Sequence, residues 1–102
     1  MEKKENPAAQ PQLQVEIDDV TARGTYTNLA LITHSETEFI LDFLFIQPQT
    51  QKAKVLSRVV SSPVHMKRLL RALKENVERY EARFGPIDAG QPPQQAPAGF
   101  FQ

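Results

Sequence analysis

The sequence contains no cysteine, and that absence excludes disulfide bonds and thiolate zinc sites. Its two histidines, His34 and His65, are too few for a metal site of their own. Twelve basic and twelve acidic residues cancel, so no overall charge draws the chain toward nucleic acid or anionic lipid. No apolar run reaches the roughly 20 residues that a membrane-spanning helix needs. We therefore expect no cofactor, no metal and no membrane partner.

The two ends of the chain have little that can fold. Residues 1–11 are charged and then rich in proline, alanine and glutamine, and residues 86–102 return to the same low complexity. Such compositions predict disorder, because they bury too little apolar surface. The first residues, Met-Glu-Lys-Lys-Glu-Asn-Pro, lack the apolar core of a signal peptide, so we expect a soluble cytoplasmic protein. A single domain, residues 12–85, remains. A domain of that size buries little apolar surface by itself, and oligomerisation is one way to bury more.

Four segments of that domain have the pattern of β-strands. Leu13, Val15 and Ile17 alternate with polar residues, the period-2 signature of a half-buried strand. Residues 25–33 are β-branched and aromatic, and residues 38–46 and 53–61 flank a turn that contains Pro48. We predict an α+β protein, with a four-stranded antiparallel β-meander followed by one long C-terminal α-helix.

The segment 38–46 is apolar on both faces, and the rest of the chain is organised around it. A strand with no polar side has to be covered twice. The one predicted helix covers one sheet face, and a second copy of the chain would cover the other. The pattern therefore predicts a homodimer or a higher homo-oligomer.

Asp42 is the one charged residue inside this central strand. If the turn is centred near Thr50, Asp42 faces Arg58, Ile40 faces Val60, and Leu44 faces Leu56. Opposite charges at facing positions stabilise a sheet and fix its register. A binding or catalytic pair is the alternative, and we favour the structural ion pair.

A helix is predicted over residues 63–84, with Ser62 as its N-cap, Pro63 at its first position and Gly85 and Pro86 after its end. Its apolar positions follow a 4-3-4-3-4 spacing that suits packing on the sheet, on a partner's helix, or on both. The first half of the helix is basic and the second half is acidic. The basic residues, candidates for partner binding, are Lys67, Arg68, Arg71 and Lys74.

The predicted C-terminal tail ends with Phe100 and Phe101. Two bulky apolar residues at the end of a flexible tether are candidates for a short docking peptide. Three alternatives stay open at this point: a partner-binding motif, an inert tail end, and packing of both rings back onto their own domain.

Several short motifs are spread along the domain: Tyr26, Asn28, Glu38-Phe39-Ile40-Leu41-Asp42-Phe43, Pro48, Arg58-Val59, Ser62-Pro63, Leu69-Leu70, Asn76, Tyr80-Glu81 and Phe84-Gly85. With these motifs the sequence resembles a family of small bacterial and archaeal proteins, domain of unknown function 3467. The resemblance covers about residues 12–87, and it implies a stand-alone cytoplasmic protein of prokaryotic type with no assigned activity. The order of strands before one long helix is also similar to the export chaperone SecB, at the level of fold alone.

From these patterns we expect a non-enzymatic, homo-oligomeric interaction protein that binds a protein or peptide, in the manner of a chaperone or an adaptor. The alternative is a nucleic-acid-binding or regulatory protein that uses the basic half of the helix. Zero net charge and the lack of a nucleic-acid-binding motif weigh against that alternative. An enzyme is the third class, and the polar candidates lack the spacing of a nucleophile, a base and an orienting group. Those candidates are Asn28, His34, Asp42, Arg58 and His65.

Overall fold

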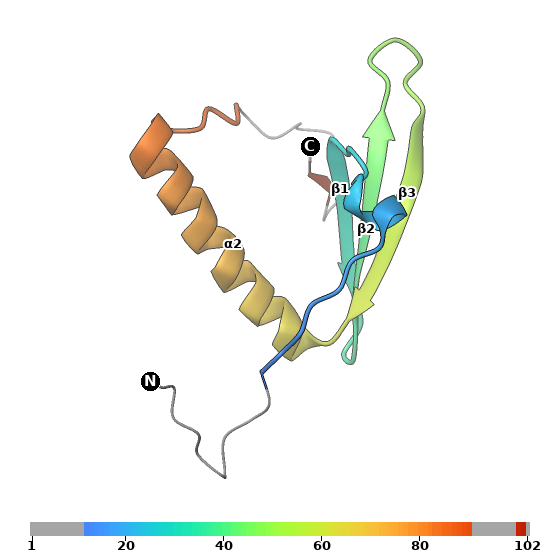
Figure 1. Cartoon of the computed structure of the whole chain (residues 1–102). Coiled ribbons are helices and arrows are strands. Elements are labelled where there is room, and N and C mark those ends of the chain that lie inside the picture. Colours follow the sequence, from blue (N-terminus) through green and yellow to red (C-terminus); the bar gives the residue numbers. More distant parts are fainter. Residues whose placement is uncertain (1–11, 91–99, 102) are drawn as a thin grey trace.

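The computed structural model describes residues 12–90 and 100–101 (Figure 1). The elements follow one another as α1 (Asp19–Ala22), β1 (Leu29–His34), β2 (Phe39–Ile46), β3 (Ala53–Ser61), α2 (Pro63–Phe84) and β4 (Phe100–Phe101). The protein is thus an α+β chain in which an antiparallel sheet precedes one long helix. No helix of the described residues has the length and apolar character needed to cross a membrane.

The long strands β1, β2 and β3 form an antiparallel meander with β2 in the middle. This arrangement confirms the three predicted strands nearest the helix, although β1 begins later than predicted, at Leu29. The two-residue β4 lies beside β1, where Phe101 pairs with Ala30 and Phe100 with Leu31. The backbone of the tail residues Phe100 and Phe101 thus pairs with their own domain. Of the other residues predicted to be disordered, 86–90 have no regular structure, and 1–11, 91–99 and 102 lie outside the described residues.

The predicted strand over residues 13–17 is wrong for this chain. Leu13, Val15 and Ile17 belong to a segment without regular structure, and all three side chains are exposed. The segment leads into the short helix α1, whose N-cap Asp18 accepts a 2.7 Å hydrogen bond from the backbone N–H of Thr21. An alternating pattern makes a strand only where the segment pairs with another strand, and residues 13–17 pair with no strand of the described sheet.

The β2–β3 register is correct at one end and wrong at the other. Asp42 faces Arg58 and Ile40 faces Val60, as predicted. Leu44, however, faces Val55 and not Leu56, because a β-bulge interrupts the pairing between Phe43 and Leu44. A bulge places one extra residue on one strand and shifts the register by one from there on.

Helix α2 begins and ends where the local sequence predicts. The Ser62 hydroxyl accepts a 3.1 Å hydrogen bond from the N–H of His65, and Pro63 occupies the first helical position. At the other end, the N–H of Gly85 donates to the Glu81 carbonyl, and Gly85 adopts a φ of 98°, which a side chain would disfavour. The Glu81 carboxylate then accepts the N–H of Ile87 at 2.9 Å.

The predicted packing of α2 along a sheet face is wrong. The helix starts beside the end of β3 and then runs away from the sheet (Figure 1). None of its residues is buried. A single residue, Ser62, links β3 to α2 in an extended conformation, with φ −81° and ψ 157°, because the residue before a proline avoids the helical region. Such a short link fixes the direction in which the helix leaves the sheet.

The core of the described chain is therefore small. Its buried apolar side chains are Leu29, Leu41 and Leu44, all from β1 and β2. Leu41 lies on one face of β2, and Leu44, which faces Leu29, lies on the other. The central strand is apolar on both faces as predicted, but the β3 side of the sheet stays half-open, with Val55, Leu56, Val59 and Val60 exposed by 41–50%.

Candidate interaction surface

Asp42 and Arg58 form a two-pronged ion pair across β2 and β3. Arg58 donates from Nε to Asp42 Oδ1 at 2.7 Å and from Nη2 to Asp42 Oδ2 at 2.8 Å. The Asp42 side chain is 7% exposed and the Arg58 side chain 62%, so the guanidinium lies over a buried carboxylate at the sheet surface. This pairing is the one predicted from the sequence. With both carboxylate oxygens engaged by the guanidinium, the geometry is that of a register-fixing pair.

The pair shifts the proton affinity of both groups. Hydrogen bonding from Arg58 lowers the pKa of Asp42 below its ordinary value; burial acts in the opposite direction, and the positive charge of Arg58 adds to the lowering. Hydrogen bonding to Asp42 raises the pKa of Arg58. Both groups are therefore charged at neutral pH.

Asn28 performs a structural task that the sequence did not reveal. Its side-chain amide donates to the carbonyl of Ile46 at 3.1 Å, and its side-chain oxygen accepts the N–H of Ile46 at 2.9 Å. An asparagine side chain presents one acceptor and a donor group much as a peptide unit does. The Asn28 side chain therefore adds one more pair of hydrogen bonds to the β1–β2 ladder, just before the first residue of β1. A single asparagine inside the β-branched and aromatic segment 25–33 is the signal that was available.

The other polar candidates lie apart from the Asp42–Arg58 pair. The His34 ring stacks on Phe39, with ring centroids 5.2 Å apart, at the far end of the β1–β2 hairpin. His65 contributes its backbone N–H to the cap of α2. Asn76 bonds within its own helix, to the carbonyl of Ala72 at 2.9 Å. In the described part of the chain, no three histidine, aspartate or glutamate side chains gather as metal ligands would.

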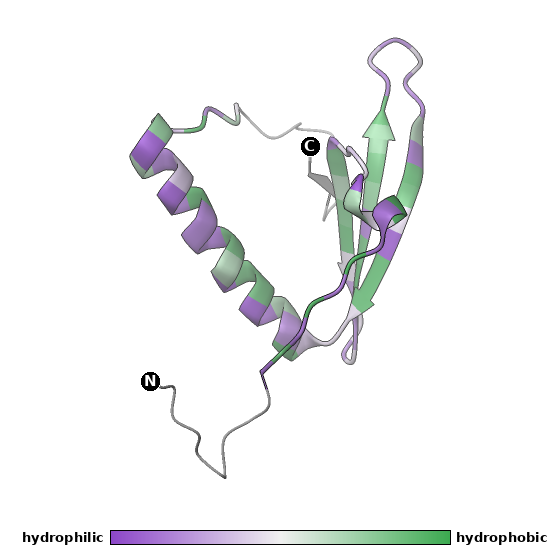
Figure 2. Ribbon diagram, in the orientation of Figure 1, coloured by the Kyte–Doolittle hydropathy of each residue, from purple (hydrophilic) through white to green (hydrophobic). Residues whose placement is uncertain are grey.

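An apolar stripe runs the length of α2 and stays open to solvent. From Leu69 onward its members are 38–66% exposed, and only Met66, at its start, is half-buried. Figure 2 shows green apolar patches recurring along the helix between purple ones. An amphipathic helix is stabilised mainly by packing of its apolar face, and this face has almost nothing packed on it. The α2 stripe consists of Met66, Leu69, Leu70, Leu73, Val77, Tyr80 and Phe84.

The α2 stripe meets the sheet only at a small hollow where the two diverge. The hollow has a volume of about 220 Å³, and its walls are apolar. The sheet contributes Ile32 and Phe39, and the helix contributes Met66, Leu69, Leu70 and Leu73. The stripe and this sheet face thus open onto a common apolar space.

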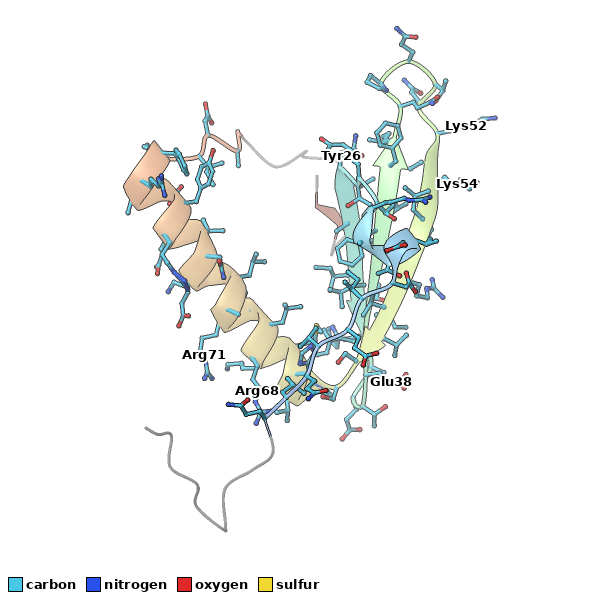
Figure 3. The ribbon with its side chains drawn as sticks, in the orientation of Figure 1. Tyr26, Glu38, Lys52, Lys54, Arg68 and Arg71 are labelled. Carbon is cyan, nitrogen blue, oxygen red and sulfur yellow. The ribbon has the colours of Figure 1, made fainter. Side chains whose placement is uncertain are left out.

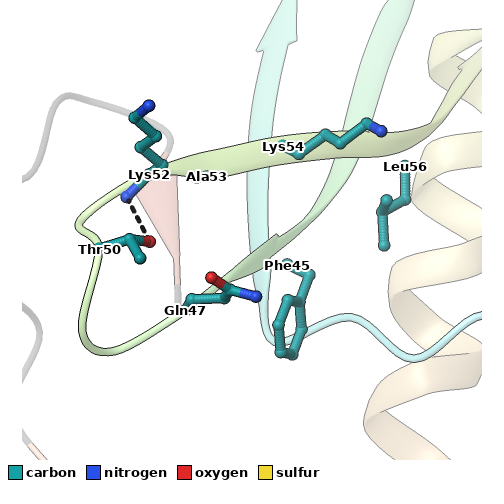
Figure 4. Close-up of a pocket in the computed structure, with 7 residues that line it drawn as sticks. All are labelled: Phe45, Gln47, Thr50, Lys52, Ala53, Lys54 and Leu56. Atoms are coloured by element: carbon teal, nitrogen blue, oxygen red, sulfur yellow. Dashed lines mark hydrogen bonds between the residues drawn. The ribbon is translucent and has the colours of Figure 1, made fainter.

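A second hollow, of about 480 Å³, lies at the β2–β3 turn (Figure 4). The ring of Phe45 and the side chain of Leu56, the extra residue of the bulge, line it from two strands. Lys52 and Lys54 lie on its β3 side, and Lys52 extends away from the hollow (Figure 4). The turn itself is held by Thr50, whose hydroxyl accepts the N–H of Lys52 at 3.4 Å. The hollow is an open apolar surface at the edge of the sheet with positive charge beside it.

The basic candidates Lys67, Arg68, Arg71 and Lys74 are all exposed on the first half of α2. Arg68 and Arg71 lie on the side of the helix away from the sheet (Figure 3). They are followed by Glu75, Glu78 and Glu81, and Glu75 forms an exposed ion pair with Arg79 at 3.8 Å. The polar side of α2 is therefore basic in its first half and mixed in its second half, where Arg79 and Arg83 stand among the glutamates.

Comparison with family models identifies the family of the chain, whereas comparison with individual proteins finds no match. Neither the curated proteins nor the solved structures contain a match, so the likeness of element order to SecB stays a prediction. The model of one family, described as protein of unknown function (DUF3467), matches residues 1–89. The match extends from the first residue through the whole of α2, further toward the N-terminus than the motifs quoted above. The chain belongs to this family, DUF3467.

Proposed function

We propose that the protein is a non-enzymatic interaction protein that works as a homo-oligomer and binds a protein or an extended peptide. The observation that carries this proposal is the uncovered apolar surface, namely the α2 stripe and the β3 side of the sheet. Exposed apolar surface on this scale marks an interface, because a monomer that left it in water would aggregate. The one buried carboxylate of the described residues, Asp42, is held by Arg58, which favours a structural role over a catalytic one.

Self-association is supported by the size of the core. Three buried leucines cannot stabilise a domain of this length against the entropy of folding. Covering the α2 stripe and the open sheet faces with a second copy would give each chain the core that it lacks. This is the arrangement in which folding and association are one process.

Binding of an extended peptide is supported by the free side of β3. In the described sheet β3 is an edge strand of nine residues, with β2 on its other side. An edge strand offers unpaired backbone groups to which an added strand can bind. The hollow lined by Phe45 and Leu56 lies beside this edge and would receive an apolar side chain of the peptide. Lys52 and Lys54 favour a partner with acidic residues nearby.

A protein partner is favoured over nucleic acid by the charge pattern of α2. Binding to a phosphate backbone calls for a continuous basic surface. Three glutamates on the second half of α2 interrupt its basic residues, so the basic surface does not continue along the whole helix. A surface divided in this way fits a partner that itself carries both charges.

The peptide-binding proposal can be tested with a fluorescently labelled, carboxymethylated polypeptide that is permanently unfolded. We expect its anisotropy to rise with added protein, and we expect Leu56→Asp to weaken the binding about tenfold, because a carboxylate would then occupy the apolar hollow. Val20→Asp, an equally charged change at an exposed apolar site on α1, serves as the matched control. No binding by the natural chain, or equal binding by Leu56→Asp, would contradict the proposal.

A further inference from the structure

The positions of the α2 stripe read the same in both directions. Six of its members follow the spacing 4-3-4-3-4, so the pattern is symmetric about a point midway between Leu73 and Val77. Two copies of the helix can therefore match apolar row to apolar row in an antiparallel as well as a parallel orientation. The spacing alone leaves the orientation open. The six members are Met66, Leu70, Leu73, Val77, Tyr80 and Phe84.

The charges beside the stripe decide between the two orientations. At 3.6 residues per turn, the basic and acidic residues of one flank fall within an arc of about 80° next to the stripe. In a parallel pair, this flank of one helix faces the opposite flank of the other, where Leu69 and Asn76 offer no charged partner. In an antiparallel pair the flank faces itself, so that Lys67 lies near the partner copy's Glu81 at both ends and Lys74 lies near the partner copy's Lys74 at the middle. The two attractive pairs outnumber the one repulsive pair, and the charges therefore favour the antiparallel orientation. The flank consists of Lys67, Arg71, Lys74, Glu78 and Glu81.

We propose that two copies of this chain pair through α2 in an antiparallel orientation, with the twofold axis passing between Leu73 and Val77. This inference rests on the proposed homo-oligomer and specifies how its helices meet. The three kinds of apolar row in such a pair are Met66 with Phe84, Leu70 with Tyr80, and Leu73 with Val77.

The open space beside the helix suits this pairing. The hollow between α2 and the sheet lies at Met66, and the row that contains Met66 brings Phe84 of the second copy to the same place. The Phe84 side chain is 66% exposed in the single chain and packs only on its own helix, with its ring 4.9 Å from that of Tyr80. In the pair it would fill the hollow against Ile32 and Phe39. The second helix would then cover the helix-side face of the sheet as well as the stripe.

The area of the stripe is compatible with an interface of two copies. With about 150–200 Å² for a fully exposed large apolar side chain, the exposed fractions leave roughly 500–600 Å² of the stripe uncovered on each copy. Two stripes thus supply about 1,000–1,200 Å², the lower limit of a specific interface. Burial of Ile32 and Phe39 under the partner's helix takes the total above that limit.

Charge reversal at Lys67 and Glu81 tests the orientation. Both Lys67→Glu and Glu81→Lys place like charges together in an antiparallel homodimer, so we expect each to weaken dimerisation about tenfold at low salt. An equimolar mixture of the two variants, and the double variant Lys67→Glu/Glu81→Lys, should recover the affinity. Arg68→Glu makes the same charge change on the far side of the helix from the stripe and should leave the affinity unchanged.

A disulfide assay gives a second readout that does not depend on charge. Because the natural chain has no cysteine, Leu73→Cys and Val77→Cys variants can be mixed and oxidised. Antiparallel pairing predicts the mixed disulfide as the main product, whereas parallel pairing predicts the two homodisulfides. Dimers that are insensitive to Lys67→Glu, or that give homodisulfides, would overturn the antiparallel pairing and leave the homo-oligomer standing. A natural chain that is monomeric would overturn both.

Discussion

At the scale of single residues, the ion pair between Asp42 and Arg58 shows how one charge is accommodated inside an apolar strand. Burial alone would make an aspartate on β2 unfavourable. The facing arginine supplies two hydrogen bonds and the opposite charge, while its own exposed side chain keeps contact with water. The pair also discriminates between registers, because a one-residue slip would carry Asp42 away from its partner.

Replacing Asp42 by Asn should lower the melting temperature at neutral pH and have little effect in strong acid. The folded-state pKa of Asp42 lies below the ordinary value of 3.8, so its contribution to stability is present above that value. The contribution is lost as the pH falls through the folded-state pKa. Melting curves of both proteins at neutral pH and at about pH 2 should therefore converge toward acid. A difference that stays constant across this range would contradict the ion pair.

Asn28 supports a second prediction at this scale. Asn28→Ala removes both side-chain hydrogen bonds to the backbone of Ile46, and we expect a loss of about 1–2 kcal/mol in the free energy of unfolding. Urea denaturation of the natural chain and the variant measures it. Asn28→Asp keeps an oxygen that accepts the Ile46 N–H, but an ionised carboxylate cannot donate to the Ile46 carbonyl. A protonated carboxyl group can donate, so the loss in Asn28→Asp should be smaller at a pH where that group is protonated. Equal stability of Asn28→Ala and the natural chain would show that the bonds contribute nothing.

At the scale of elements, the sequence predicts best where the signals are local. Ser62 and Pro63 start α2 and Gly85 ends it, because the cap, the first helical position and the positive φ each depend on one or two residues. The hairpin of β2 and β3 is predicted for the same reason. The bulge opposite Leu44 is not predictable in this way, since it depends on how the turn and the ion pair are accommodated in one hairpin.

The failed predictions concern contacts between distant parts of the chain. Leu13, Val15 and Ile17 have the alternation of a strand, but a strand also needs an edge to pair with. The α2 stripe has the spacing of a packed helix, yet its spacing does not identify what packs on it. Both elements expose apolar residues in the single chain, and both patterns fit a molecule that is completed by a further copy.

The N-cap of α2 permits a prediction for this element. Ser62→Ala removes the hydroxyl that accepts the His65 N–H, and we expect a loss of about 1 kcal/mol in the free energy of unfolding. Ser62→Asp keeps an acceptor at the same place and should retain most of the stability. Chemical denaturation followed by circular dichroism compares the three proteins. A destabilisation of Ser62→Asp as large as that of Ser62→Ala would show that the cap is not the cause.

At the scale of the whole molecule, the single chain leaves much of its apolar surface uncovered. Its sheet is apolar on both faces, its helix leaves the sheet, and its buried apolar side chains come from two strands. Each feature is costly in a monomer, and each is resolved if further copies cover the α2 stripe and the sheet. The ion pair, the side-chain pairing of Asn28 and the helix caps then hold the chain in a shape that presents these surfaces.

Sedimentation equilibrium of the full chain at micromolar concentration tests this account most directly. One chain has a mass of 11.5 kDa. The account predicts a stable assembly with at least twice that mass, whose α2 stripe is protected from solvent. A folded, soluble species that sediments at the mass of one chain, with no tendency to aggregate, would contradict it.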